Sequence, residues 1–561
     1  MKKKLFTLFN TLNENNPYVL LLIFIVTMIA ICYPLFNRQM SVGHDMNYHL
    51  LRIQALKEGV FSRQFPVRID PFFIKNFGYA SSLFYPDLFL YFPAFLLALG
   101  FSIDVSNKLF LLVTIVVCFI TTYYCGLGIL KNKYPSIIIA VVFSLSQYHL
   151  QNIYARFALG EIQSYMFIPL IAYGLYDFIY ENFEKPWLLI IGFCGLCYSH
   201  VLSLMIAGTI SVVMSFFSLK RIIIDSKKIK TLVFSFVIFA TCTCFFWAPF
   251  IEQIFSNTFK FQQIIPSNLS GISVKIPVML ANAYGIDGRS CSFGISILLL
   301  CILRIFINNS PEIKTQRRII DWGLLCGFSI LFVASEAFPW KYVPSIFGSI
   351  QFAWRLYAFA SMFLSIAIGL MIDILCRRKF RIIGLAMLVL YMCGSAVIVI
   401  SNSITSTTYI TTKYLENTAF SIGNGEWLPV GVDSTEILRK EPVVLTDNGT
   451  SLSFSKTGIR TTIKSVPHCK YFDVPLIYYK GYTAVIKNGP EISSRLRISN
   501  EGQNKTIRVY CSEITESGTV IVDYTGTIIQ KLSMGVSLLS LVMIGLLLFQ
   551  RRNKYRRLSS G

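Results

Sequence analysis

Residues 18–36 read YVLLLIFIVTMIAICYPLF, an apolar run without a charged side chain. A helix of about 20 such residues crosses a hydrocarbon core of ~30 Å, so this stretch predicts a transmembrane helix. Comparable runs recur near 108–130, 135–149, 164–180, 187–219, 231–250, 290–307, 319–337, 355–376, 380–401 and 532–550. With 54% hydrophobic and 14% charged residues, the 561-residue chain falls outside the usual composition of soluble proteins. The sequence therefore predicts a polytopic α-helical membrane protein.

Two stretches decide how many spans we predict. Residues 187–219 are too long for one span and are interrupted at Ser199-His200, so we divide them into two helices. The run 83–99 contains two prolines and an aspartate, and counting it as a span would place the basic loops 220–230 and 377–381 outside, against the positive-inside rule. We therefore predict about 12 transmembrane helices, an interfacial helix at 83–99, both termini in the cytoplasm, and a retained first helix rather than a signal peptide.

The net charge is +22, from 51 Lys and Arg against 29 Asp and Glu. In a soluble protein this excess would suggest nucleic acid, but here the basic residues gather in short segments between apolar runs. We therefore expect membrane lipids, and no nucleic acid, among the partners.

The region 402–531 is the one sizeable polar segment, and we expect it to be an extracytoplasmic β-rich domain. Residues 507–510 and 519–524 alternate between apolar and polar side chains, and Asn-Gly turn signals lie near 448 and 488. Residues 532–561 then supply a final transmembrane helix and a basic cytoplasmic tail. Most of the 14 cysteines sit singly inside apolar runs, whereas Cys469 and Cys511 both lie in the β-rich region, where a disulfide between them is an open alternative.

Candidate chemistry begins just beyond the first predicted helix, where His44, Asp45, His49 and Arg52 are packed into nine residues. Asp45 is a candidate general base or metal ligand, and His49 follows it by one helical turn. The alternative is that Asp45 simply caps the helix that starts there.

Further charged residues fall in later outer segments. Glu161 and Arg156 are the only charges in the second outer loop, where they form either a functional pair or a plain ion pair. Trp354 and Arg355 open a later span, and Arg355 either grips a phosphate or reaches lipid headgroups. His200 either lines the same cavity or ends a helix.

The chain resembles the GT-C superfamily of membrane glycosyltransferases, and more narrowly it is similar to bacterial YfhO-like membrane proteins. The residues that carry the resemblance are Gly43-His-Asp45 with His49-Leu-Leu-Arg52, Phe65-Pro-Val-Arg68, Gly78-Tyr79 to Phe84-Tyr-Pro86, Ala155 to Glu161, Gln351-Phe-Ala-Trp-Arg355 and Phe472 to Tyr482. Each piece is short, but together they span nearly the whole chain.

The resemblance implies transfer of a sugar from a polyprenyl-phosphate donor to an extracytoplasmic glycan or lipid acceptor, such as a surface polysaccharide, teichoic acid or glycolipid. Residues 1–401 would be the catalytic domain, with 37–107 as its first outer loop. Asp45 and Glu161 would be the catalytic acids, and Arg355 with Arg52 would hold the donor phosphate. His44, His49, Arg156, His200 and Trp354 would complete the substrate site.

The chain departs from the superfamily pattern at Ala353, where proline is expected, and it lacks a paired-acid motif after Asp45. Dependence on Mg²⁺ or Mn²⁺, with Asp45 and Glu161 as ligands, is therefore left open. Two other functions remain as alternatives: a transporter or flippase of lipid-linked sugars, and a non-catalytic cell-envelope assembly protein. The basic inner loops fit a bacterial plasma membrane.

Overall fold

The computed structural model describes residues 16–264, 269–281, 291–377, 380–411, 414–415, 422–423, 425–488, 491–511 and 518–559. By its internal contacts the chain divides into two compact units. Unit 1 comprises Met1–Met46, Asn107–Phe236 and Ile265–Ile410, and unit 2 comprises Asn47–Ser106, Val237–Ile264 and Thr411–Gly561.

Unit 1 is helical. Its helices are α2 (Pro17–Cys32), α7 (Ile103–Leu130), α8 (Lys133–Ser144), α9 (Gln147–Gln151), α10 (Leu159–Ser164), α11 (Ile168–Tyr180), α12 (Trp187–Ser199), α13 (Val201–Phe217), α14 (Leu219–Ile223), α17 (Ile276–Leu280), α18 (Ser296–Cys301), α19 (Lys314–Ala334), α20 (Tyr357–Leu375) and α21 (Arg381–Ser403). The first four residues of α7 are assigned to unit 2, and α15 (Ser226–Ser256) passes from unit 1 into unit 2. A two-stranded antiparallel pair, β1 (Met40–Ser41) with β2 (Thr407–Thr408), also belongs to unit 1.

Each apolar run predicted from the sequence contains a helix within its described residues, and the long run 187–219 breaks at His200 between α12 and α13. Within the described residues, six helices are long and apolar enough to span a membrane, and five more apolar helices are shorter. The prediction of a polytopic α-helical membrane protein is confirmed. The number of 12 spans stays a prediction.

Small residues let the central helices of unit 1 approach closely. A Cβ added at Gly369 of α20 would lie 2.9 Å from the Pro135 carbonyl oxygen of α8, and one at Gly323 of α19 would lie 3.0 Å from the Phe363 carbonyl oxygen of α20. Membrane helices commonly pack through small residues because lipid supplies no hydrophobic force between them. This packing buries α20 along most of its length and so anchors Arg355, which lies in the short 3₁₀ turn η9 (Ala353–Leu356) just before it.

The helices of unit 2 come from two stretches of the chain. They are α3 (Met46–Phe61, whose first residue belongs to unit 1), α4 (Phe73–Asn76), α5 (Ser81–Phe84), α6 (Tyr91–Ala98), the second half of α15, α16 (Lys260–Ile264), α23 (Ser434–Arg439) and α24 (Ile528–Ser559). The run 83–99 is no continuous helix, because α5 stops at Phe84, Tyr85 is extended and the chain resumes with the 3₁₀ turn η2 (Leu88–Leu90) before α6. An unbroken span over 83–99 is thereby excluded, and its interfacial position stays a prediction.

Unit 2 also contains two five-stranded antiparallel sheets. Their strands are β3 (Val444–Thr446), β4 (Ser451–Leu452), β5 (Phe454–Thr457), β6 (Arg460–Ile463), β7 (Tyr471–Ile477), β8 (Tyr482–Asn488), β9 (Glu491–Leu496), β10 (Ile498–Ser499), β11 (Thr506–Tyr510) and β12 (Thr519–Tyr524). One sheet has the order β10-β11-β7-β3-β4 and the other β5-β6-β12-β8-β9. The alternation predicted at 507–510 and 519–524 falls on β11 and β12, so the C-terminal β region is confirmed.

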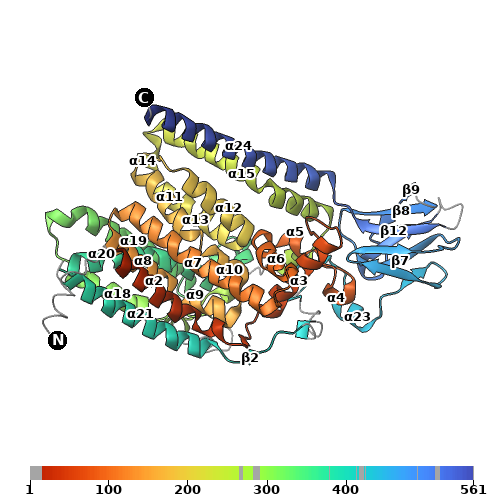
Figure 1. Ribbon diagram of the computed structural model, residues 1–561, viewed down its shortest axis with the longest axis horizontal. Helices are drawn as coiled ribbons and strands as arrows, with labels where there is room; N and C mark the ends of the chain where they lie inside the picture. The colour runs from red at the N-terminus through yellow and green to blue at the C-terminus, as the bar shows by residue number, and fades with distance from the viewer. Residues whose placement is uncertain are drawn as a thin grey trace. The chain divides into compact units, whose positions relative to one another are not determined.

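The last helix, α24, runs alongside the second half of α15 (Figure 1). The Ser537 hydroxyl of α24 donates to the Thr241 carbonyl oxygen and accepts from the Phe245 backbone N–H, both at 2.9 Å. A polar side chain is thus satisfied between two apolar helices, as expected for helices that meet in lipid.

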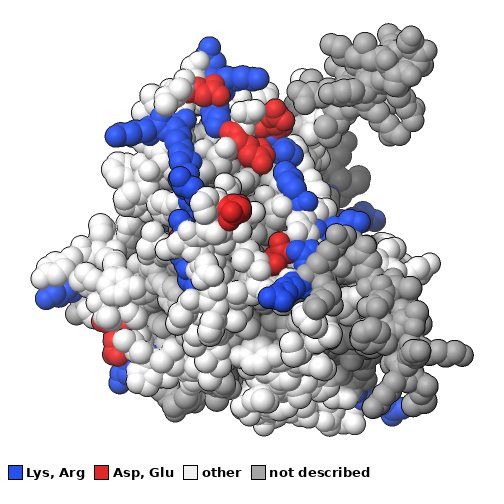
Figure 2. Space-filling view, turned by 90° about the vertical axis from the view of Figure 1, so that its left-hand side faces the viewer, with Lys and Arg blue, Asp and Glu red and all other residues white. Residues whose placement is uncertain are grey.

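Lys and Arg side chains, with Asp and Glu side chains among them, are visible on one face of the molecule (Figure 2). In unit 1, the loops predicted to be cytoplasmic contain partly paired basic residues, as in Lys131–Glu181 at 3.7 Å and Arg304–Asp321 at 2.7 Å. The orientation of the chain across the membrane stays a prediction.

Candidate active site

The candidate site in unit 1 is built on an irregular, buried segment between α8 and α11. After α9 the chain makes a π-helical turn, η3 (Asn152–Arg156), and Phe157 then adopts a left-handed conformation with φ of 57°. The Ala158 N–H bonds back to the Asn152 carbonyl oxygen at 3.1 Å before α10 begins at Leu159. Non-glycine residues with positive φ and π-turns are both enriched at functional sites. Here they place Arg156 and Glu161 face to face.

The Glu161 carboxylate is the centre of a buried ionic cluster. Its Oε1 accepts from Nη1 of Arg156 at 2.7 Å and from Nε of Arg355 at 3.0 Å. Its Oε2 accepts from the Tyr148 hydroxyl, which in turn accepts from Nη1 of Arg156 at 3.1 Å. The side chains of Glu161, Arg156 and Arg355 are 5%, 7% and 8% exposed. The expected ion pair of Glu161 with Arg156 is present, and Arg355 joins it rather than reaching toward lipid headgroups.

Arg355 is held in place from its own segment as well. Its Nη1 donates to the Ile350 carbonyl oxygen at 2.5 Å and to the Gln351 side-chain oxygen at 2.9 Å. Gln351 itself has a φ of 63°, a strained conformation for a residue other than glycine, which persists only where the surrounding structure enforces it. These bonds fix the guanidinium plane before any ligand arrives.

Asp45 is attached to the same segment through its backbone. The His44 N–H donates to the Ala155 carbonyl oxygen at 3.1 Å, and the Asp45 N–H donates to the Arg156 carbonyl oxygen at 2.8 Å. Gly43 permits this approach, because a Cβ there would lie 2.5 Å from the Cβ of Phe157. Residues 111 positions apart in the sequence are thereby fixed in register.

The Asp45 carboxylate differs from that of Glu161 in having no hydrogen-bond or ion-pair partner among the residues that the structure describes. Burial raises the pKa of the Asp45 carboxyl, which also experiences the charges of Arg156, Glu161 and Arg355. The pKa of Glu161 shifts in the opposite direction. Burial alone would raise it, but the Arg156 and Arg355 guanidinium groups outweigh burial and hold the pKa below its usual range. One acid is therefore neutralised by partners, whereas the other is available.

The helix-cap alternative for Asp45 is not supported. Asp45 does precede the first residue of α3, Met46, but within the described chain its carboxylate accepts no backbone N–H. The Met46 N–H bonds instead to the Gly43 carbonyl oxygen at 3.3 Å. An acid in a cap position without a cap bond is a candidate for a ligand-directed role.

Each arginine of the cluster keeps donors in reserve. Arg156 uses Nη1 for its three bonds, to Tyr148, Asn152 and Glu161, and Arg355 uses Nε and Nη1. Across the described part of the chain, neither Nη2 atom makes a hydrogen bond, and neither is completely buried. A guanidinium with a free edge binds phosphate or carboxylate oxygens readily.

His200 and Trp354 lie near this cluster. Nδ1 of His200 accepts the Ser203 N–H at 3.2 Å, so His200 does cap α13, yet it is 5% exposed and experiences the charges of Glu161, Arg355 and Arg156. Trp354 stacks on Phe352 at a centroid distance of 4.2 Å, and its indole nitrogen is buried without a partner among the described residues. The helix-end alternative for His200 is therefore observed, and its place in a substrate cavity stays a prediction.

The remaining predicted site residues are divided between the units. His44 is exposed beside Asp45 in unit 1, whereas His49 and Arg52 are buried in unit 2. There Arg52 donates to the carbonyl oxygens of Tyr85 at 2.9 Å and Pro86 at 3.0 Å, and its guanidinium lies 4.4 Å from the centre of the Tyr85 ring. These bonds give Arg52 a structural role in its own unit. A donor-phosphate role for Arg52 stays a prediction.

Sequence reasoning missed Tyr148, which bonds to both Arg156 and Glu161, and Asn152, whose side-chain oxygen accepts from Arg156 at 2.8 Å. Both are uncharged and lie in a run that reads as an ordinary apolar span followed by a loop. The available signal was spacing, because Asn152 and Tyr148 precede Arg156 by one and two helical turns.

The side chains present do not fit a divalent cation. Among the described residues no group of three or more His, Cys, Asp and Glu side chains converges as a metal site would require. Both Glu161 oxygens already accept hydrogen bonds, two of them from guanidinium groups that would repel a cation. Metal ligation by Asp45 together with Glu161 is thus disfavoured, and no step is routed through a metal.

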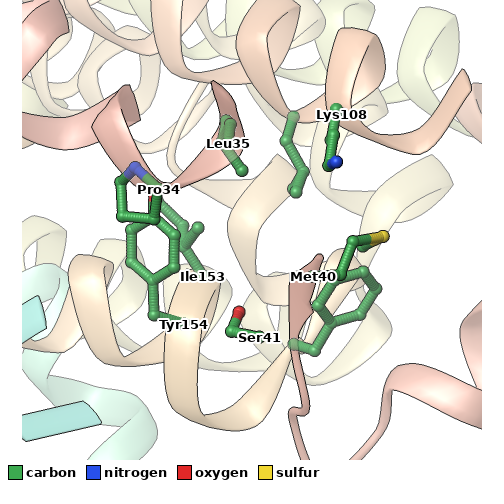
Figure 3. A pocket seen from close by; sticks show the side chains of 9 residues that line it. Pro34, Leu35, Met40, Ser41, Lys108, Ile153 and Tyr154 are labelled. Atoms are coloured by element: carbon green, nitrogen blue, oxygen red, sulfur yellow. The ribbon is translucent and has the colours of Figure 1, made fainter. Parts of the chain in front are cut away.

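A small pocket lies against the turn formed by residues 153–157 (Figure 3). It is lined by Pro34, Leu35, Met40, Ser41, Lys108, Leu111, Ile153, Tyr154 and Phe157. The Lys108 ammonium group donates to the Asn37 carbonyl oxygen at 2.7 Å, and the Tyr154 hydroxyl donates to the Ile31 carbonyl oxygen at 2.5 Å. The pocket walls are otherwise largely apolar, so it supports the turn at Phe157 rather than adding charge to the site.

Comparisons with known proteins give one family and several structural neighbours. A family model described as "6-pyruvoyl-tetrahydropterin synthase related domain; membrane protein" matches residues 83–410. No curated protein matches the chain.

Among solved structures, the chain is similar to the arabinofuranosyltransferase AftD from Mycobacteria, with 14% identity and a TM-score of 0.46 over 72% of this chain and 28% of that one. It is also similar to the Archaeoglobus fulgidus oligosaccharyltransferase AglB in complex with an inhibitory peptide and a dolichol-phosphate, with 11% identity and a TM-score of 0.36 over 71% of this chain and 56% of that one. The chain thus spans between about a quarter and somewhat more than half of these proteins.

Proposed function

Because this chain belongs to the membrane-protein family described as 6-pyruvoyl-tetrahydropterin synthase related domain, and because it holds a free acid beside a buried two-arginine cluster, we propose that it is a membrane glycosyltransferase. It transfers a sugar from a polyprenyl-phosphate donor to an extracytoplasmic glycan or lipid acceptor. This is the activity implied by its sequence resemblance to the GT-C superfamily. The membrane is a bacterial plasma membrane, with both termini in the cytoplasm.

The observation that carries the proposal is the contrast between the two acids. Glu161 is pinned between Arg156 and Arg355 at 2.7 and 3.0 Å, whereas the Asp45 carboxylate, fixed to the same segment, is unpaired within the described chain. Asp45 is partly buried, and a partly buried charge without a partner carries a folding cost that a purely structural acid would avoid by pairing. An acid kept unpaired against that cost suits proton transfer.

The arginines supply the anion site. The four charged groups Asp45, Glu161, Arg156 and Arg355 sum to zero when all are ionised, so the cluster itself does not repel an anion. The free Nη2 donors of the two arginines receive the donor phosphate. As the bond between the anomeric carbon and the phosphate oxygen breaks, negative charge grows on the phosphate, and fixed guanidinium donors stabilise that charge best.

Asp45 is the general base. The acceptor hydroxyl oxygen attacks the anomeric carbon, its proton passes to the Asp45 carboxylate, and the phosphate leaves with the electron pair of the broken bond. Attack opposite the leaving phosphate inverts the anomeric configuration. A pKa raised by burial makes Asp45 a stronger base than an exposed aspartate, which favours this proton transfer.

Glu161 positions rather than transfers protons. Its low pKa and its three hydrogen bonds make it a poor base, but it holds both guanidinium groups at fixed angles. His44, His49 and His200 belong to the substrate site, Arg52 is a further candidate ligand of the donor phosphate, and the β strands of unit 2 bind or orient the acceptor.

The test is sugar transfer in detergent from synthetic polyprenyl-phosphate sugars, with Asp45→Asn and Arg355→Ala beside the wild type. The matched controls are Asp321→Asn and Arg304→Ala, which break an ion pair of the same residue types whose Asp321 and Arg304 side chains are 49% and 29% exposed. We expect Asp45→Asn to abolish transfer, Arg355→Ala to weaken donor binding, and both controls to retain activity.

If an authentic donor and acceptor both bind to the wild type and no product forms, a transporter or assembly protein replaces this proposal. Transfer that survives Asp45→Asn would instead refute the assignment of the base while leaving the activity in place.

A further inference from the structure

Two cysteines of unit 2 lie in direct contact. Cys469 precedes β7 by two residues, and Cys511 follows the last residue of β11, Tyr510. The two strands are antiparallel neighbours with Tyr510 opposite Tyr471, and the Cys511 N–H donates to the Lys470 carbonyl oxygen at 2.9 Å. This register brings the two sulfur atoms to 3.4 Å from each other.

The pair is set apart from the other cysteines of the chain. Twelve of the 14 cysteines lie before residue 402, mostly within apolar helices, and only these two belong to the polar C-terminal region. Cys469 is partly exposed, whereas Cys511 is 1% exposed. An accessible thiol in contact with a buried one is the arrangement that thiol–disulfide exchange uses, because the first reacts with the oxidant and the second resolves the intermediate.

We propose that Cys469 and Cys511 form a disulfide, made by exchange with an external dithiol-type oxidant in its disulfide form. The Cys469 thiolate attacks the oxidant's disulfide and gives a mixed disulfide. The Cys511 thiolate then attacks Sγ of Cys469, the second sulfur of the oxidant leaves as a thiolate, and the two thiol protons end on the reduced oxidant. Two electrons pass from the cysteine pair to the oxidant.

The surroundings favour catalysed over spontaneous oxidation. Burial raises the pKa of the Cys469 thiol, although its contact with Cys511 partly opposes that rise, and burial raises the pKa of Cys511 more strongly. Because the thiolate is the reactive form, little of it is present at neutral pH and dissolved oxidants act slowly. An oxidant that docks on the partly exposed Cys469 offsets the small thiolate fraction by raising the local concentration of its disulfide.

The bond would act on a strand that reaches other parts of unit 2. Beyond β7 the chain continues to Tyr479, whose hydroxyl donates to the Trp427 carbonyl oxygen at 3.2 Å, and to Lys480, which exchanges hydrogen bonds with Gln253 of α15 at 2.7 and 3.2 Å. The disulfide ties the opposite end of β7 to β11. It therefore keeps β7 and β11 together at the start of β7, whereas the Lys480 contacts hold the chain beyond the end of β7.

The experiment uses the full-length protein in intact cells, blocked with a thiol-alkylating reagent at lysis and examined by peptide mass spectrometry with and without reductant. Cells are compared before and after exposure to an oxidised dithiol that does not cross the membrane. We expect a linked peptide pair containing Cys469 and Cys511, lighter by two hydrogen atoms than the two separate peptides and lost on reduction.

The variants Cys469→Ser and Cys511→Ser should each abolish the linked pair and leave the other thiol fully alkylatable after unfolding, whereas Cys393→Ser, in α21, should leave the linked pair unchanged. Full alkylation of both cysteines in the wild type, before and after the oxidant, overturns the proposal. A linkage of either cysteine to a different partner overturns it as well. Neither readout depends on sugar transfer, so the glycosyltransferase proposal is tested separately.

Discussion

Replacing Glu161 by Gln is expected to destabilise the protein, whereas replacing Asp45 by Asn is not, although both acids belong to unit 1 and Asp45 is bonded through its backbone to the segment that carries Glu161. Glu161→Gln removes the negative charge that Arg156 and Arg355 share at 2.7 and 3.0 Å, in a site where all three side chains are less than a tenth exposed. Breaking a buried ion pair by removing one partner costs about 3–5 kcal/mol, because the remaining charge is left without compensation. At ~1.4 kcal/mol per factor of ten, the folding equilibrium constant falls by between about a hundredfold and several thousandfold.

Asp45→Asn removes no ion pair or hydrogen bond to a described residue. The pKa of the Asp45 carboxyl is raised in the folded protein, so its stabilising contribution is present only at low pH and is lost as the pH rises through that raised value. At neutral pH the charged carboxylate therefore opposes folding. The uncharged amide is expected to leave the free energy of unfolding within about 0.5 kcal/mol or to increase it.

The assay is reversible unfolding of the purified protein in detergent, run on the same preparations that are used for sugar transfer. The expected result for Asp45→Asn is a wild-type unfolding transition with no transfer, and for Glu161→Gln an earlier transition with reduced transfer. If Asp45→Asn destabilises the protein as much as Glu161→Gln does, Asp45 is a structural residue and the assignment of the base is refuted. If Glu161→Gln unfolds as the wild type does, the carboxylate does not hold the two arginines.

Three further predictions concern other residues. Burial raises the pKa of Asp70, in unit 2, from 3.8 to about 7, so its contribution to stability, roughly 4 kcal/mol, is complete below pH 3.8 and lost by about pH 7. Thermal unfolding between these pH values should show the stability of the wild type falling as the pH rises, and this fall should be absent in Asp70→Asn. Gly43→Ala forces a Cβ to within 2.5 Å of Phe157, so sugar transfer should fall while the protein stays folded, as circular dichroism would check. Unchanged transfer kinetics would contradict the close approach of Gly43 to Phe157. Arg355→Lys keeps the charge but loses the Nε–H bond to Glu161 and the free Nη2 donor, so the KM for the donor should rise more than kcat falls; a wild-type KM would exclude phosphate binding there.

Much of the helical architecture follows from local sequence. The apolar runs around α2, α7, α20 and α21 had the length and composition of membrane helices, and the break at His200 between α12 and α13 was visible as a polar pair in a long apolar run. Helix formation in apolar segments depends on residues close together in the chain, because each backbone bond joins residues four apart. The period-two alternation that predicted β11 and β12 is equally local.

By itself the sequence determined that the chain is a membrane protein with a C-terminal β region, and it identified Asp45, Arg156, Glu161 and Arg355 as the charges to examine. Only the tertiary structure decided how they differ, since the partners of Glu161 come from positions 148, 156 and 355 and Asp45 is fixed by backbone bonds to residues 155 and 156. The contact between Cys469 and Cys511 was settled in the same way, by the register of β7 and β11. Pairing across such distances depends on how helices and strands pack, and the energy of a buried charge depends on which partners that packing supplies.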